Sequence, residues 1–230
     1  MGQPAFGKET IEVINKLINK GVTRLSVLMR HSARHYDKEH PEREPFLWLT
    51  EEGKKAAYDF GTQLPAKLKT RFFSSVLGRC VETAYSIDKG FCRQNGETVS
   101  NIIEPDFSPF FVKDPYKVFQ LSEELGTEKF FGDWFDGKIS DKLMDNPRQT
   151  AEKMINRLIV NQRSHSEPGI DIAVSHDWNL YLIKEYFLKL DPHEVTTVNY
   201  LEGTVLYFEN SDCFITNHQT EPQRVEIPVL

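Results

Sequence analysis

Apolar positions along the chain follow two patterns that alternate with one another. Apolar residues recur at helical spacing in the stretches 8–20, 51–64, 78–91, 146–163 and 178–190. Between these stretches lie short apolar runs bounded by polar residues, which are typical of strands buried on both faces. The runs are RLSVLM (24–29), RFFSSV (71–76), SNII (100–103) and GIDIAV (169–174), with GTVLYFEN (203–210) and CFITNH (213–218) as a predicted closing hairpin.

The alternation of strands and helices predicts right-handed βαβ units. We therefore expect an α/β fold, a three-layer α/β/α sandwich whose mostly parallel central sheet is flanked by helices. Thr50 is expected to cap one helix through its hydroxyl, and Asn146 with Pro147 opens another.

The pattern is lost between Phe107 and Asp145, where phenylalanine and tryptophan alternate with proline, glycine and acidic residues. We expect one domain over residues 1–230. Within it, 107–145 is a helical, aromatic-rich insertion that caps the site, because it leaves the sheet beside a strand end. Phe110 and Trp134 are then the candidates for selecting the substrate. The alternative is a satellite core without a functional role, since aromatic clusters usually pack together.

Charge and cysteine content argue against several classes of function. Lys and Arg number 28 against 34 Asp and Glu, so the net charge of −6 offers no global basic field for nucleic acid or an anionic membrane. The N-terminus has no stretch of the signal-peptide type, and no run approaches roughly eighteen apolar residues, so we expect a cytoplasmic protein. Three cysteines without CxxC spacing argue against a disulfide framework and a cysteine-based zinc site.

Charged side chains follow each of the first four predicted strands. In parallel sheets ligands bind beyond the C-terminal strand ends, so these residues are expected to share one cleft. They are Arg30, His31 and Arg34 after the first strand, Arg79 after the second, Glu104 after the third, and His176 with Asp177 after the fourth.

Three arginines in one cleft predict an anionic ligand. Packed guanidinium groups repel one another unless an anion lies between them, and their paired donors match phosphate oxygens. Nearby positive charge disfavours imidazolium, so His31 is expected to be neutral, with a free ring nitrogen able to attack phosphorus. The cluster therefore predicts a site that binds a phosphoryl group and attacks it with a histidine.

The leaving oxygen of such a reaction needs a proton donor, and two carboxylates compete for this role. Asp177 directly follows His176, which is expected to touch the phosphate, whereas Glu104 ends a weaker strand ahead of Pro105. Geometry therefore favours Asp177. The alternative for Asp177 is a structural role as a helix N-cap.

Four segments together resemble the histidine phosphatase superfamily, which includes phosphoglycerate mutases, histidine acid phosphatases and phytases. They are LMRHSAR (28–34), LTEEGKKAA (49–57), SSVLGRCVETA (74–84) and VSHDWNL (174–180), and they lie in the family's order over most of the chain outside the insertion. The resemblance implies a phosphohistidine on His31. The residues that it implies as a clamp on the phosphoryl oxygens are Arg30, Arg34, Arg79 and His176.

The signals for a subgroup of that family are mixed. RHSAR places a second arginine, Arg34, as acid phosphatases and phytases do, and SHDWN is similar to their His-Asp motif, which favours Asp177 as the proton donor. Ser32 stands where glycine is usual, and SSVLGRCVETA is similar to the mutase-like branch, which favours Glu104. The resemblance implies a phosphatase that hydrolyses a small phosphate monoester and needs neither a metal nor a cofactor.

Three other functions compete with this interpretation. HSARHYDKEH (31–40) offers His31, His35 and His40 as ligands for a metal, but Arg30 and Arg34 would crowd a dication there. We therefore expect the last two histidines at the rim of the site or on the surface. The second competing function is a phosphoglycerate mutase-like phosphotransferase. The third is a non-catalytic module that binds a phosphorylated ligand, and turnover of a generic phosphate ester distinguishes such a module from an enzyme. The sequence leaves the natural ester and the oligomeric state open.

Overall fold

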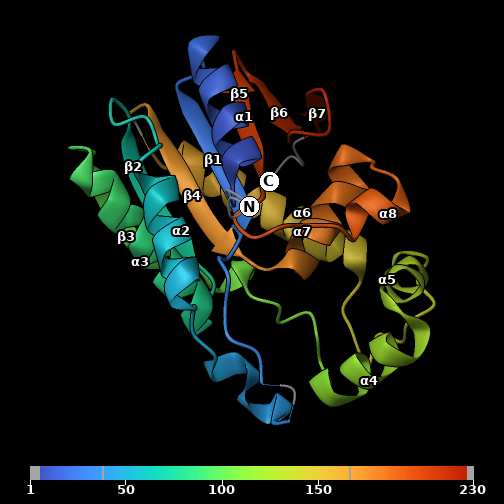
Figure 1. Ribbon diagram of the computed structural model, residues 1–230. Coiled ribbons are helices and arrows are strands. Elements are labelled where there is room, and N and C mark those ends of the chain that lie inside the picture. Colours follow the sequence, from blue (N-terminus) through green and yellow to red (C-terminus); the bar gives the residue numbers. More distant parts are fainter. Residues whose placement is uncertain (1–5, 38, 166, 227–230) are drawn as a thin grey trace.

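The computed structural model describes residues 6–37, 39–165 and 167–226 (Figure 1). Its helices are α1 Lys8–Asn19, α2 Glu51–Gly61, α3 Gly78–Arg93, α4 Pro115–Leu125, α5 Thr127–Phe135, α6 Pro147–Arg163, α7 Asp177–Ile183 and α8 Pro192–Val195. Its strands are β1 Arg24–Arg30, β2 Lys69–Ser74, β3 Thr98–Ile103, β4 Gly169–Ser175, β5 Gly203–Glu209, β6 Asp212–Thr216 and β7 Gln223–Val225. Short 3-10 helices span Pro41–Phe46 and Pro105–Phe107, and a π-helical segment, Lys184–Leu188, continues α7.

The strands of the described residues form one mixed sheet in the order β3-β2-β4-β1-β5-β6-β7. The strands β3, β2, β4 and β1 are parallel to one another, whereas β5, β6 and β7 pair antiparallel. The predicted closing hairpin is confirmed as β5 and β6, and Asn210 in its turn has a φ of 55°, a conformation that asparagine tolerates better than most residues. Among the strands of the described residues, only the short strand β7 has no predicted counterpart. The four parallel strands end at the same edge, which is where the site is expected.

The helices cover both faces of the sheet, as the three-layer prediction requires (Figure 1). One hydrophobic cluster joins α1, α2 and α3 to one face, and a second joins α5, α6 and α7 to the other. Successive side chains of β1 lie on opposite faces of the sheet. Val27 and Met29 belong to the cluster that includes α1, and Leu28 belongs to the cluster that includes α6. This two-sided burial explains why β1 appears in the sequence as a continuous apolar run.

Two helices begin at the polar residues that the sequence indicates. The Thr50 hydroxyl accepts a hydrogen bond from the Gly53 amide at 3.0 Å, and the Asn146 side chain accepts one from the Gln149 amide at 3.0 Å. Among the described residues, no helix combines the length and the apolar character needed to cross a bilayer.

The insertion 107–145 contains α4 and α5, and most of its phenylalanine and tryptophan rings fall into two sets. One set, Phe107, Phe111, Phe130, Phe131 and Trp134, is buried in the same hydrophobic cluster as α6 and α7. The other set, Phe110 and Phe119, is exposed to solvent. The insertion therefore packs through most of its rings and leaves a few of them free.

Candidate active site

His31 and His176 leave the sheet side by side, because the strands that precede them are neighbours. Arg30 of β1 pairs in register with Ser175 of β4, and the His31 amide donates to the Ser175 carbonyl at 3.0 Å. The two imidazole rings lie 5.6 Å apart between centroids, at an angle of 67°. Both residues are almost fully buried, with 2% and 3% of their surface exposed.

The hydrogen bond of His31 fixes its tautomer. Its Nδ1 lies 2.8 Å from the Ser32 carbonyl oxygen, which can only accept, so Nδ1 carries the ring proton and Nε2 keeps a free lone pair. Burial lowers the pKa of His31 well below its usual value, and the positive charges of His176, when protonated, and Arg79 lower it further. His31 is therefore a neutral imidazole at neutral pH.

The loop that carries His31 is anchored to two helices. The Ser32 hydroxyl donates to the Gly53 carbonyl of α2 at 2.8 Å, and the Ser32 amide donates to the Thr83 hydroxyl of α3 at 3.1 Å. A Cβ atom at Gly53 would lie 2.0 Å from the Ala33 carbonyl oxygen, so only glycine permits this approach. The close packing holds the histidine in place with little freedom.

His176 is held by partners on two sides. Arg79 Nη2 lies 3.4 Å from Nδ1, and since guanidinium groups only donate, Nδ1 accepts and Nε2 donates to the Ser75 hydroxyl at 2.8 Å. Burial lowers the pKa of His176 well below its usual value, with Arg79 as the next largest cause. Cys80 Sγ lies 3.5 Å from Nε2, but burial raises the pKa of this thiol to about 12, so it stays protonated.

Three arginines surround the two histidines. Arg34 pairs with the Glu44 carboxylate, and Arg79 donates to the Glu44 carbonyl oxygen at 3.2 Å. Arg30 Nη2 lies 2.9 Å from an Asp177 carboxylate oxygen, and its Nη1 donates to the Val198 carbonyl at 2.7 Å. The Nε of each arginine is buried without a hydrogen-bond partner. An unpaired buried donor is costly, so this cluster favours an anion that supplies further acceptors.

These side chains line a cavity of about 380 Å³ at the carboxyl ends of the parallel strands. Its described lining residues are Arg30, His31, Arg34, Tyr36, Glu44, Pro45, Leu77, Arg79, Pro109, Phe110, Val112, Pro115, Phe119, His176, Asp177 and Trp178. The structure thus brings together every charged residue and histidine that the sequence analysis placed at the strand ends, except Glu104.

Glu104 follows β3 as predicted but does not line the cavity. Its carboxylate accepts from the Asp106 amide at 3.2 Å and lies 3.4 Å from Arg157 Nε of α6. The cause is the strand order, because β3 lies at the edge of the sheet with β2 between it and β4. With about 4.8 Å between neighbouring strands, its end is roughly 10 Å from that of β4.

Asp177, in contrast, lies in the cavity as the first residue of α7. One carboxylate oxygen pairs with Arg30 and the other accepts from the Trp178 amide at 2.9 Å. His176 occupies the N-cap position, so Asp177 is not the N-cap that the sequence offered as an alternative.

Glu44, Ser75 and Tyr200 belong to the site although sequence reasoning did not identify them. Ser75 directly follows the observed strand β2 and lies near the end of the predicted strand 71–76, which was a usable signal. Glu44 and Tyr200 lie outside the α-helices and strands, where no periodicity marks a buried face. The Tyr200 ring lies 4.4 Å from the Arg30 guanidinium carbon, a cation–π contact.

A buried lysine holds the loop that supports Arg30. Lys184 Nζ donates to the Thr197 carbonyl at 2.7 Å and pairs with the Glu202 carboxylate at 2.8 Å. The Glu202 carbonyl in turn accepts from the Arg30 amide at 2.9 Å, so the loop 197–202 is fixed between Lys184 and β1.

Lys184→Met is expected to lower the free energy of unfolding by about 3 kcal/mol, because it leaves the Glu202 charge buried without a partner. Urea denaturation measures this loss. The double variant with Glu202→Gln removes both charges and should recover part of the stability. A single variant as stable as the parent protein would show that this ion pair contributes nothing.

The residues that the metal alternative requires do not converge. His35 is exposed, and His40 pairs with Asp37 at 3.2 Å. Within the described ranges, no group of three or more His, Cys, Asp or Glu side chains is placed to hold a metal ion.

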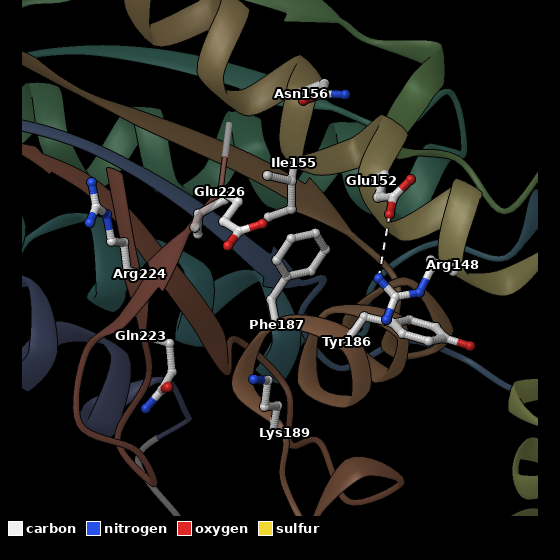
Figure 2. Close-up of a pocket in the computed structure, with 11 residues that line it drawn as sticks. Arg148, Glu152, Ile155, Asn156, Tyr186, Phe187, Lys189, Gln223, Arg224 and Glu226 are labelled. Carbon is white, nitrogen blue, oxygen red and sulfur yellow. Dashed lines mark ion pairs between the residues drawn. The ribbon is translucent and has the colours of Figure 1, made fainter. Parts of the chain in front are cut away.

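A larger cavity of about 500 Å³ lies between α6, the π-helical segment and β7 (Figure 2). Arg148 pairs with Glu152 at 3.6 Å and lies over the Tyr186 ring at 5.2 Å, and Arg224 pairs with Asp212 at 2.6 Å. None of its described lining residues is a histidine or a cysteine. The two buried histidines, His31 and His176, therefore lie in the smaller cavity and not in this one.

The sequence of the chain matches the model of the histidine phosphatase superfamily (branch 1) over residues 26–219. This span includes every described residue that lines the 380 Å³ cavity. A search of curated proteins finds no match.

Solved structures with the same fold are similar over most of the chain. A phosphoserine phosphatase from Entamoeba histolytica is 16% identical over 84% of this chain and 95% of its own, with a TM-score of 0.53. YhfR from Bacillus stearothermophilus is 16% identical over the same shares, with a TM-score of 0.54, and mycobacterial hydrolase 1 is 13% identical over 88% and 97%, with a TM-score of 0.55. At these identities the likeness concerns the fold alone.

Proposed function

Because the chain belongs to the histidine phosphatase superfamily (branch 1), we propose that it hydrolyses a small phosphate monoester through a phosphohistidine on His31. The observation that carries this proposal is a neutral, buried histidine with a free Nε2, set among three arginines in one cavity. A neutral imidazole beside guanidinium groups is suited to attack a phosphoryl group that those groups hold.

In the first step, the arginines and His176 bind the phosphoryl oxygens and His31 Nε2 attacks phosphorus. The N–P bond forms while the bond from phosphorus to the leaving oxygen breaks. The imidazole becomes positively charged, and the Ser32 carbonyl, already 2.8 Å from Nδ1, stabilises that charge through the same hydrogen bond. Asp177 supplies the proton that the leaving oxygen needs.

Asp177 starts this step paired with Arg30. A bound phosphoryl group competes for the same guanidinium, and its negative charge favours the neutral form of a carboxyl beside it. In the second step the Asp177 carboxylate takes a proton from water, and the oxygen of that water attacks phosphorus. The N–P bond breaks, phosphate is released, and His31 returns to its neutral form.

Arg79→Ala tests the clamp. Arg79 contacts His176 and Glu44 at the centre of the cluster, so its loss should lower kcat about a hundredfold, which corresponds to about 3 kcal/mol of transition-state stabilisation. Inhibition by phosphate or vanadate should weaken in parallel. The assay uses chelator-treated protein, which is expected to keep its full rate.

Arg148→Ala is the matched control, because Arg148 lies in the other cavity and pairs with Glu152 (Figure 2). An unchanged rate and unchanged inhibition in Arg79→Ala would place that residue outside the site. Phosphate binding without turnover of any ester would instead favour the non-catalytic module.

A further inference from the structure

Beyond the phosphate-binding cluster, the cavity is lined by apolar side chains. Pro109, Phe110 and Val112 follow β3, Phe119 lies on α4, and Trp178 lies on α7. The Phe119 and Trp178 rings pack at 5.5 Å between centroids. The charged residues of the cavity come instead from the strand ends and from the segment 30–44.

The charges in this cavity are already engaged around the phosphoryl site. Arg30 pairs with Asp177, and Arg34 and Arg79 share Glu44. Among the described lining residues, no further charged side chain faces the leaving group. A leaving group with its own carboxylate or ammonium would lose hydration there without gaining a dedicated partner.

The apolar wall is also unusually open to solvent. Phe110 is 62% exposed and Phe119 is 47% exposed, although neighbouring rings of the same insertion are fully buried. A flat ring laid against Phe119 would cover this surface and gain a ring–ring contact beyond the area that it buries. A cavity of about 380 Å³ lies in the range of small-molecule sites and has room for a phosphoryl group with one ring system.

We infer that the substrate is a phosphomonoester whose leaving group carries an uncharged aromatic ring system. The inference rests on the proposed function, because it assigns the part of the substrate that departs from His31. The insertion 107–145 then selects the leaving group through Phe110 and Phe119, while Trp134 only supports it from the core.

The test compares kcat/KM of the full chain on four esters: 2-phenylethyl phosphate, ethyl phosphate, hexyl phosphate and O-phosphoserine. All of them release an alkoxide, so differences report mainly on recognition. The kcat/KM of the phenylethyl ester should exceed that of ethyl phosphate roughly thirtyfold, because the ring removes about 80 Å² of additional apolar surface from water when it binds. It should exceed hexyl phosphate about threefold or more, because a chain cannot stack, and O-phosphoserine should be the poorest.

The variants Phe119→Ala and Phe110→Ala should each reduce the ratio between phenylethyl and ethyl phosphate severalfold. Tyr116→Ala is the matched control, since Tyr116 also lies on α4, is 79% exposed and does not line the cavity. This control should leave the ratio unchanged. Thermal unfolding of each variant shows that the fold is retained.

The outcomes separate this inference from the proposed function. Equal kcat/KM on phenylethyl and ethyl phosphate, or an unchanged ratio in Phe119→Ala, would overturn the inference while hydrolysis through His31 stands. Hexyl phosphate as good as the phenylethyl ester would overturn the preference for a ring. No turnover of any ester would overturn the proposed function together with the inference.

Discussion

His31→Ala should reduce turnover of every phosphate ester to the background rate. Among the described residues that line the cavity, no other side chain combines a neutral ring nitrogen with a free lone pair, because His176 Nδ1 already accepts from Arg79. The thiol of the neighbouring Cys80 stays protonated. Without a nucleophile no covalent intermediate forms, and the expected loss is on the order of ten-thousandfold or more. Steady-state hydrolysis of a nitrophenyl phosphate measures it.

The control for this variant is His35→Ala, which removes an exposed histidine four residues along the chain. It should keep the parent rate. Retained binding of phosphate by His31→Ala would show that the site is still folded. A variant with more than a tenth of the parent rate would rule out His31 as the nucleophile.

Asp177→Asn should lose about a hundredfold to ten-thousandfold in kcat on alkyl phosphates, the range for removing a general acid. The asparagine keeps the acceptor for the Trp178 amide, so the start of α7 is preserved. On a nitrophenyl phosphate the loss should be far smaller, because that leaving group needs little protonation. The ratio of the two rates therefore reports proton donation separately from folding.

Glu104→Gln is the matched comparison. Glu104 faces Arg157 and the Asp106 amide outside the cavity. Its replacement should therefore lower kcat only slightly, and by a similar factor on alkyl phosphates and on a nitrophenyl phosphate. If Glu104→Gln shows the selective loss on alkyl phosphates and Asp177→Asn does not, the assignment of the proton donor must be reversed.

Much of the site could be predicted because it depends on strand ends. The runs that became β1, β2 and β4 are apolar and short, and parallel strands place their carboxyl ends at one edge. This geometry alone brings His31, Arg79 and His176 into one cavity. The order of the strands is set by packing across the whole sheet, not by local pattern. For that reason the sequence indicated the end of β3 correctly and still overestimated how near Glu104 lies to the histidines.

The rest of the site depends on side chains for which the sequence carries little local signal. Glu44 and Tyr200 are placed by tertiary contacts with arginines, and hydrophobic periodicity does not describe such contacts. In the insertion, likewise, the sequence does not indicate which aromatic side chains face the cavity. Its aromatic composition predicted packing near the site, but Trp134 is 1% exposed and donates to the Asp145 carbonyl, while Phe119 faces the cavity.

Trapping the covalent intermediate tests the central claim most directly. The full chain is mixed with labelled substrate, quenched in alkali, which preserves phosphohistidine, and digested, and the peptide that carries the label is identified by mass spectrometry. The account predicts a phosphoryl group on the peptide containing His31, with acid-labile and alkali-stable chemistry, and no label in His31→Ala. Label on any other residue, or product formation with no label on His31 at any quench time, would contradict it.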